Sequence, residues 1–155
     1  MLHIIERGRR IFVGVAIVLA SALTLSIAQA PPANATVGLR NEMFRATNSS
    51  RSAHDKHGLD LDAKLSAKAR RHSIAMANAD VLFHTSDVSV YLRGVSWSRW
   101  GENVGRTTED ISTLQKAFMH SKDHRTNILN GGFTHVAIGA VRRDGTLWVT
   151  VFFYG

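Results

Sequence analysis

The segment from Thr146 to Phe153, close to the C-terminus, constrains the fold more than any other part of the chain. It is apolar in both alternating sets of positions, which are Leu147, Val149, Val151 and Phe153 in one set and Trp148 and Phe152 in the other. A strand that is apolar on both faces is buried on both, so we expect a central strand in a sheet covered by helices on each side. Asp144-Gly145 directly before it is a strong signal for a two-residue hairpin turn. We therefore expect 136–141 to be the neighbouring strand.

Three earlier segments have the spacing of apolar residues that is typical of helices. They are 36–50, 64–78, and a segment that begins after Thr108 or Asp110 and ends near Ser121. Asp62 is a good N-cap for the second of them. The positions expected to face inward are Leu65, Ala69, Met76 and either Ile74 or His72 in the second helix, and Ile111, Leu114, Gln115 and Phe118 in the third. We expect Asn48 to Ser52 to form a loop, Leu59 and Leu61 to be extended, and 102–105 to be a short strand or a turn.

These elements predict one α/β layered domain, and 155 residues are enough for a sizeable core. The segment 81–100 between the second and third helices has no regular pattern. A loop of that length in a compact domain is usually functional. Its aromatic residues Tyr91, Trp97 and Trp100 could line a ligand groove or belong to the core.

The N-terminal segment 1–35 has the pattern of a secretory signal. Three arginines precede an uncharged, mostly apolar run of 17 residues, Ile11 to Ile27. We expect cleavage after Ala35, since Pro31 would hinder a protease after Ala30. An uncleaved anchor is the alternative, although a spanning helix needs ~20 apolar residues. The chain has no cysteine, which excludes thiol catalysis and disulfides, and its scattered positive charge lacks the interleaved aromatics of a nucleic-acid groove.

Short motifs follow one another through nearly all of the chain after this segment. They are Leu61-Asp-Ala-Lys-Leu65, Ala69-Arg-Arg-His-Ser73, Met76-Ala77, Phe83-His84, Gly101-Glu-Asn-Val-Gly105, Phe118-Met-His-Ser121, His124-Arg-Thr-Asn-Ile-Leu129, Phe133-Thr134, Ile138-Gly-Ala140 and Trp148 to Phe153. Because these motifs occur in this order and spacing, the chain resembles the CAP superfamily of cysteine-rich secretory, antigen 5 and pathogenesis-related-1 proteins (the SCP-like extracellular domain). Within that superfamily it is most similar to the cysteine-free bacterial branch. The resemblance implies that 36–155 form a three-layer α-β-α sandwich with a central antiparallel sheet, and that the protein is secreted.

The resemblance also implies a cleft with two histidines and two acidic residues, which in some family members holds a divalent metal. By this resemblance His84 and His124 are the two histidines and Glu102 is one of the acids. Ser121 stands where other branches have the second acid, so two carboxylates are not available for catalysis. Asn103, Trp97 and Trp100 are further candidates for lining the cleft.

The residue types suit that chemistry, but each also has a structural interpretation. Neutral imidazoles bind Zn²⁺, and a nearby carboxylate can ligate, orient a histidine or move a proton. Alternatively, Glu102 accepts hydrogen bonds from backbone amides and anchors the loop, His84 is an ordinary loop histidine, and His124 caps the C-terminal end of a helix. His120 and His124 have the spacing of a His-x-x-x-His metal helix but lack the glutamate that follows the first histidine in such proteases.

The leading functional hypothesis is a secreted, non-enzymatic binding module at the cell envelope or outside the cell. Its ligand would be a lipid, a sterol or a cell-wall fragment, and its cleft would hold a divalent metal, Zn²⁺ or Mg²⁺, weakly. We expect a monomer with no nucleic-acid partner and no membrane span after signal cleavage. A metal-dependent, protease-like hydrolase with Glu102 as general base is the alternative. A structural, wall-associated domain is the third hypothesis. Serine chemistry at Ser73 or Ser121 lacks a Gly-x-Ser-x-Gly motif.

Overall fold

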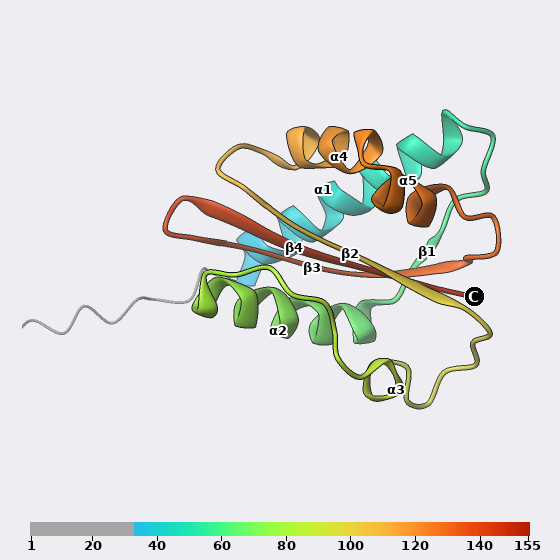
Figure 1. Ribbon diagram of the computed structural model, residues 1–155, viewed down its shortest axis with the longest axis horizontal. Helices are drawn as coiled ribbons and strands as arrows, with labels where there is room; N and C mark the ends of the chain where they lie inside the picture. The colour runs from blue at the N-terminus through green and yellow to red at the C-terminus, as the bar shows by residue number, and fades with distance from the viewer. Residues whose placement is uncertain (1–32) are drawn as a thin grey trace, which may run out of the picture.

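The computed structural model describes residues 33–155, which form a four-stranded sheet between two layers of helices (Figure 1). The elements in chain order are α1 (Ala33–Ser52), β1 (Asp60–Leu61), α2 (Ala63–Ala79), α3 (Val88–Tyr91), β2 (Trp100–Thr107), α4 (Ile111–His120), α5 (Lys122–Leu129), β3 (His135–Arg143) and β4 (Thr146–Tyr154). The signal segment expected at 1–35 lies outside the described residues except for its last three, which begin α1. None of the helices within 33–155 is long and apolar enough to cross a membrane.

The strand order is β1-β3-β4-β2, so β4 is an inner strand, as its apolar sequence predicts. It pairs antiparallel with β3 on one side and with β2 on the other. The turn between β3 and β4 has positive φ at both central residues, 47° at Asp144 and 78° at Gly145, as a type I′ hairpin requires. The short strand β1 pairs parallel with β3, so the sheet is antiparallel except at this edge.

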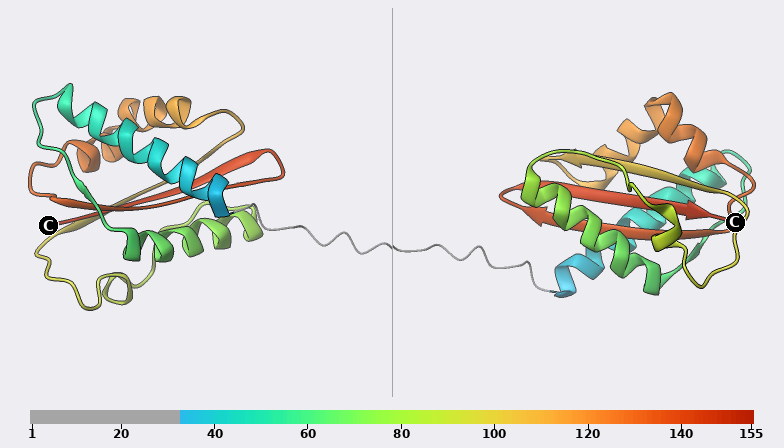
Figure 2. Two further views of the ribbon diagram at one scale, coloured as in Figure 1. Left: turned by 180° about the vertical axis from the view of Figure 1, so that it is seen from behind. Right: turned by 60° about the horizontal axis from the view of Figure 1, so that its bottom comes forward.

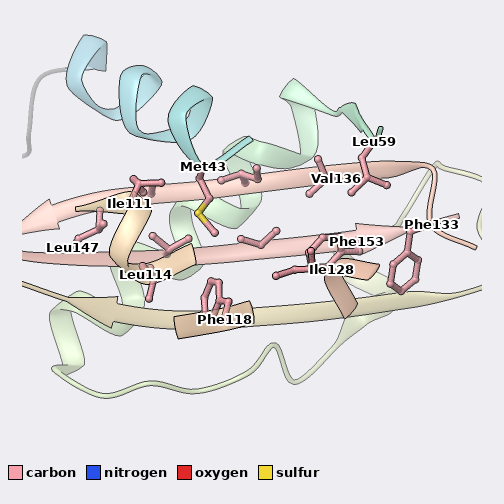
Figure 3. Close-up of a cluster of buried hydrophobic side chains, with 14 residues drawn as sticks. Met43, Leu59, Ile111, Leu114, Phe118, Ile128, Phe133, Val136, Leu147 and Phe153 are labelled. Carbon is pink, nitrogen blue, oxygen red and sulfur yellow. The ribbon is translucent and has the colours of Figure 1, made fainter. Parts of the chain in front are cut away.

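Helices α1, α4 and α5 cover one face of the sheet, and α2 and α3 cover the other (Figures 1 and 2). The largest apolar cluster lies under α1, α4 and α5 (Figure 3). Its fourteen buried members are Met43, Leu59, Ile111, Leu114, Phe118, Ile128, Phe133, Val136, Ile138, Ala140, Leu147, Val149, Val151 and Phe153. Phe152 and Trp148 belong to two smaller clusters that include residues of α2. The three-layer α-β-α sandwich is therefore confirmed, with β4 apolar on both faces.

The predicted helix caps are also present. Asp62 Oδ1 accepts a hydrogen bond of 2.8 Å from the backbone N–H of Leu65, and Asp110 Oδ1 accepts one of 2.8 Å from that of Thr113. Each bond satisfies a donor that the first turn of a helix would leave free. The inward positions expected in the third helix, α4, are all buried.

Two predictions about helix boundaries were wrong. The loop expected from Asn48 is helical to Ser52, where the buried Arg51 guanidinium holds the end of α1 by donating to the carbonyl oxygens of His57, Ile128 and Asn130 at 2.8 Å each. The helix α5 was not predicted at all. Ser121 has an extended conformation between α4 and α5, and the chain then turns helical again with Ile128 as its only fully buried side chain.

Candidate functional site

The carboxylate of Glu102 is the centre of the site. Glu102 lies on the edge strand β2, and its side chain is 0% exposed. Oε2 accepts hydrogen bonds from His84 Nδ1 at 2.8 Å and from the backbone N–H of Thr85 at 2.9 Å. Oε1 accepts a third, of 2.7 Å, from the Thr85 hydroxyl. A buried carboxylate needs such donors, and here they hold His84 and Thr85 against β2. One of the donors is a backbone amide, as the structural interpretation expected.

His84 is brought to Glu102 but stays largely in solvent, with 62% of its side chain exposed. Because a carboxylate only accepts hydrogen bonds, the contact places the proton of His84 on Nδ1. In the neutral ring, Nε2 then carries the free lone pair. A carboxylate behind a histidine orients metal-binding imidazoles in the same way. Glu102 is therefore positioned to orient the His84 ring and to keep its proton on Nδ1.

His72 on α2 is a neighbour of Glu102 that the sequence interpretation did not assign to the site. Its Nε2 donates to the carbonyl oxygen of Phe83 at 2.8 Å and lies 4.0 Å from Glu102 Oε1. Its ring meets the edge of the Phe83 ring at 5.0 Å between centroids. The available signal was its helical spacing, three residues after Ala69 and four before Met76, which places it on the inner face of α2.

His124 lies in the first half of α5, so its interpretation as a cap at a helix C-terminus was wrong. Its ring packs on Phe118 at 4.8 Å between centroids. Burial lowers the pKa of His124, the neighbouring His84 lowers it further, and Asp123 opposes the shift. The imidazole is therefore neutral at pH 7.

Two asparagines connect His124 to the strand that carries Glu102. Asn103 Nδ2 donates to the backbone carbonyl of His124 at 3.0 Å. Asn127 Nδ2 in turn donates to Asn103 Oδ1 at 2.9 Å and to the carbonyl of Glu102 at 3.2 Å. Asn103 is buried and supports α5 from β2. Asn127 was missed, although its position three residues after His124 places it one helical turn away.

We find no reactive arrangement at Ser73 or Ser121, nor at the pair formed by His120 and His124. Ser121 is the residue between the two helices, and its side chain makes no capping hydrogen bond. Ser73 is buried and bonded to the Thr150 hydroxyl at 2.9 Å. His120 ends α4, whereas His124 belongs to α5, so they do not share one helix. Within residues 33–155, no three histidine, aspartate or glutamate side chains are grouped to hold a metal ion.

The loop beside Glu102 carries a concentration of exposed apolar side chains. Seven large hydrophobic residues are exposed in the part of the chain that the structure describes, and six of them lie between 81 and 100. We call these six the apolar loop surface: Val81, Leu82, Phe83, Val90, Trp97 and Trp100. Trp97 and Trp100 are each 43% exposed, whereas Tyr91 is buried and stacks on Phe152 at 5.2 Å. Tyr91 therefore belongs to the core. Trp100 also stacks on Phe152, at 5.8 Å between centroids, so its ring packs in part on the sheet and stays exposed in part. Trp97 is available to a ligand.

Comparison with known proteins agrees with this geometry. A sequence model of the CAP family, described as the cysteine-rich secretory protein family, matches residues 44–153. The uncharacterized protein YkwD of Bacillus subtilis (strain 168) is 32% identical over 117 residues, which are 72% of this chain and 45% of YkwD.

Solved structures agree as well. An extracellular protein containing an SCP domain from Bacillus anthracis is similar with a TM-score of 0.66 and 28% identity, over 77% of this chain and 41% of that one. An outer surface protein of Borrelia burgdorferi shares the fold with a TM-score of 0.69 and 13% identity, over 83% of this chain and 98% of that one. The chain thus spans less than half the length of the two Bacillus proteins.

Proposed function

The chain belongs to the CAP (cysteine-rich secretory protein) family, and on this premise we propose that it is a secreted, non-enzymatic binding module that acts at the cell envelope or outside the cell. The extracellular protein from Bacillus anthracis supports this location. One observation carries the binding role, namely that six of the seven large exposed hydrophobic residues in 33–155 lie in the loop beside Glu102 or at its junction with β2. The ligand is then amphipathic: a lipid, a sterol or a cell-wall fragment.

Exposed apolar side chains are unfavourable in water. Removing apolar surface from water contributes roughly 25 cal/mol per Å², so a ligand that covers these side chains gains free energy that the free protein forgoes. Tryptophan suits such contacts because its ring is large and apolar while its N–H stays able to donate. The three hydrogen bonds to Glu102 hold the loop before a ligand arrives. Because the loop is already ordered in the free protein, binding costs less conformational entropy.

The hydrolase alternative requires Glu102 to take a proton from water or substrate. Its carboxylate is fully buried and already accepts three hydrogen bonds from His84 and Thr85. Because the carboxylate is buried, a water or substrate molecule could reach it only after the groups that cover it moved aside. The purely structural alternative leaves the apolar loop surface without a purpose. The geometry therefore favours binding over both alternatives.

Weak metal binding at the two histidines forms part of the proposal. Two imidazole nitrogens, with Glu102 behind His84, fit a borderline ion such as Zn²⁺ better than Mg²⁺, which prefers oxygen ligands. A bound ion would supply positive charge to polarise a ligand oxygen. We expect a calorimetric titration with Zn²⁺ to show weak one-site binding that both His84→Ala and His124→Ala remove. Binding that neither change alters would contradict a site at these histidines.

The binding role is tested by sedimentation of the protein with phosphatidylcholine vesicles, with the same vesicles containing sterol, and with purified peptidoglycan. We expect one of these to retain the protein. Trp97→Ser should weaken retention at least tenfold, because a large apolar side chain that a ligand covers contributes about 1.5–3 kcal/mol. Val90→Ser and Val37→Ser form a matched pair, since these valines are 48% and 43% exposed but only Val90 lies on the loop. Val37→Ser should bind like the wild type. Retention by none of the three, or equal loss in both valine variants, would contradict the proposal.

A further inference from the structure

A separate, open pocket of about 920 Å³ lies on the other helical layer, away from α2 and α3. It is formed by the turn after α1, the end of α4 and the helix α5. Figure 1 shows these segments at the same end of their helical layer. Its lining residues are His54, Lys56, Met119, His120, Lys122, Arg125, Thr126, Leu129 and Asn130. The volume is in the range of small-molecule sites. The function proposed above does not use this pocket.

The pocket is strongly basic. Lys56, Lys122 and Arg125 line it, and no acidic side chain does. Within residues 33–155, none of the three cations has a carboxylate within 4.0 Å. Asp55 and Asp123 are neighbours in the sequence, but both are exposed outside the lining. Three cations that converge without an anion create a positive potential that an anionic ligand would relieve.

Two hydrogen-bonded residues fix the walls of this basic pocket. His54 Nδ1 donates to the carbonyl oxygen of Ser50 at 2.8 Å, which leaves Nε2 to accept from Arg125 Nη2 at 3.3 Å. Arg51 lies buried behind the pocket and donates only to carbonyl oxygens, among them that of the lining residue Asn130. The Arg51 charge therefore has no carboxylate partner in the described part of the chain and adds to the positive potential.

We propose that the basic pocket binds the phosphate group of a phosphorylated ligand. The guanidinium of Arg125 can present paired N–H donors to two phosphate oxygens, and Lys56 and Lys122 supply point charges. Met119 and Leu129 are partly buried against the main apolar cluster and give the pocket an apolar part. A phosphate ester with an organic group thus matches the lining better than a bare inorganic anion. Such a group occurs both in soluble phosphate esters and in phospholipid headgroups.

The test begins with a calorimetric titration of glycerol 3-phosphate, a soluble phosphate ester, into the protein at low salt. We expect saturable binding to one site, weakened at least tenfold in the double variant Lys122→Gln/Arg125→Gln. The matched control is Lys64→Gln/Arg45→Gln, which removes the same charge from exposed positions outside the pocket lining. It should bind within about twofold of the wild type. Absence of saturable binding, or an equal loss in both double variants, would overturn the proposal by showing only general electrostatic attraction.

A second arm separates the two sources of phosphate. The Trp97→Ser protein is used as the background, so that the apolar loop surface contributes little to vesicle binding. Sedimentation of this protein with phosphatidylglycerol vesicles is compared with its sedimentation with phosphatidylcholine vesicles. Retention by phosphatidylglycerol alone, lost on adding Lys122→Gln/Arg125→Gln, assigns the pocket to a lipid headgroup. Glycerol 3-phosphate binding without vesicle retention assigns it to a soluble phosphate ester. Vesicle retention that survives the double change would overturn the pocket as the phosphate site.

Discussion

The two sides of the sheet are held together by different means. Under α1, α4 and α5, fourteen buried apolar side chains form one continuous cluster. On the other side the apolar clusters are smaller, with Tyr91 and Leu92 of the 81–99 loop buried in one of them. Hydrogen bonds to the Glu102 carboxylate fix the start of this loop at His84 and Thr85. Where apolar burial secures the structure, few apolar side chains remain for a ligand. Where a carboxylate secures it, the apolar side chains of the loop stay exposed.

The largest effect on stability is expected from the apolar side. Phe153→Ala removes a fully buried ring that stacks on Phe133 at 5.6 Å between centroids. Because the substitution leaves a cavity as well as losing apolar burial, we expect the free energy of unfolding to fall by about 3–5 kcal/mol. Urea denaturation measures the loss. A loss below about 1 kcal/mol would show that this cluster does not secure the fold.

A smaller effect is expected from the carboxylate. Glu102→Gln removes the charge that His84 and Thr85 donate to and places an amide against their donors, so unfolding should become easier by about 1–3 kcal/mol. Thr85→Val removes one of the three bonds and serves as a graded comparison, with a loss of about 1 kcal/mol. If the Glu102→Gln protein is as stable as the wild type, then the carboxylate does not contribute to holding its side of the sheet, and the contrast with the apolar side fails.

A third prediction concerns His124 and the pH dependence of the free energy of unfolding. Burial lowers the pKa of His124 below its ordinary value of 6.5, so the folded protein binds this proton less tightly than the unfolded chain. The stability contributed by the neutral ring is complete above pH 6.5 and is lost as the pH falls through the lowered pKa. His124→Phe keeps an aromatic ring against Phe118 and should flatten the pH dependence of unfolding in this range. An unchanged pH dependence would contradict the assignment.

The smallest effect on stability is expected on the apolar loop surface itself. Trp97→Ser changes an exposed side chain and should alter the free energy of unfolding by less than about 0.5 kcal/mol. The same change is expected to weaken ligand binding at least tenfold. Thermal unfolding measured beside the sedimentation assay separates the two quantities. A stability loss comparable to that of Phe153→Ala would mean that Trp97 belongs to the framework.

The framework could be predicted from the sequence because its signals are local. The Asp144-Gly145 turn, the two-faced apolar strand after it, and the caps at Asp62 and Asp110 each depend on a few neighbouring residues. The helix α5 gave no such signal, because only Ile128 and Leu129 in it are apolar. Arg51 was misplaced in a loop for a related reason. Its burial depends on carbonyl oxygens of residues 128–133, which only the folded chain brings to it.

The candidate site could be predicted in part. The resemblance to the CAP family singled out His84 and Glu102, which the structure joins through a hydrogen bond. It also singled out His124, but not the asparagine bridge from β2 that positions α5. His72 and Thr85 were missed, since a histidine on an apolar helix face and a threonine in a loop have ordinary structural explanations. The metal-binding role of the histidines stays a prediction.

The central claim is that Glu102 holds a loop whose exposed apolar side chains bind the ligand. Hydrogen exchange of the amides in 81–99, measured in the wild type and in Glu102→Gln, tests it most directly. Exchange at Thr85 and its neighbours is expected to become much faster in Glu102→Gln while the amides of β3 and β4 keep their protection. Equal protection of the loop in both proteins would contradict the account, because the loop would then be held by something other than the carboxylate.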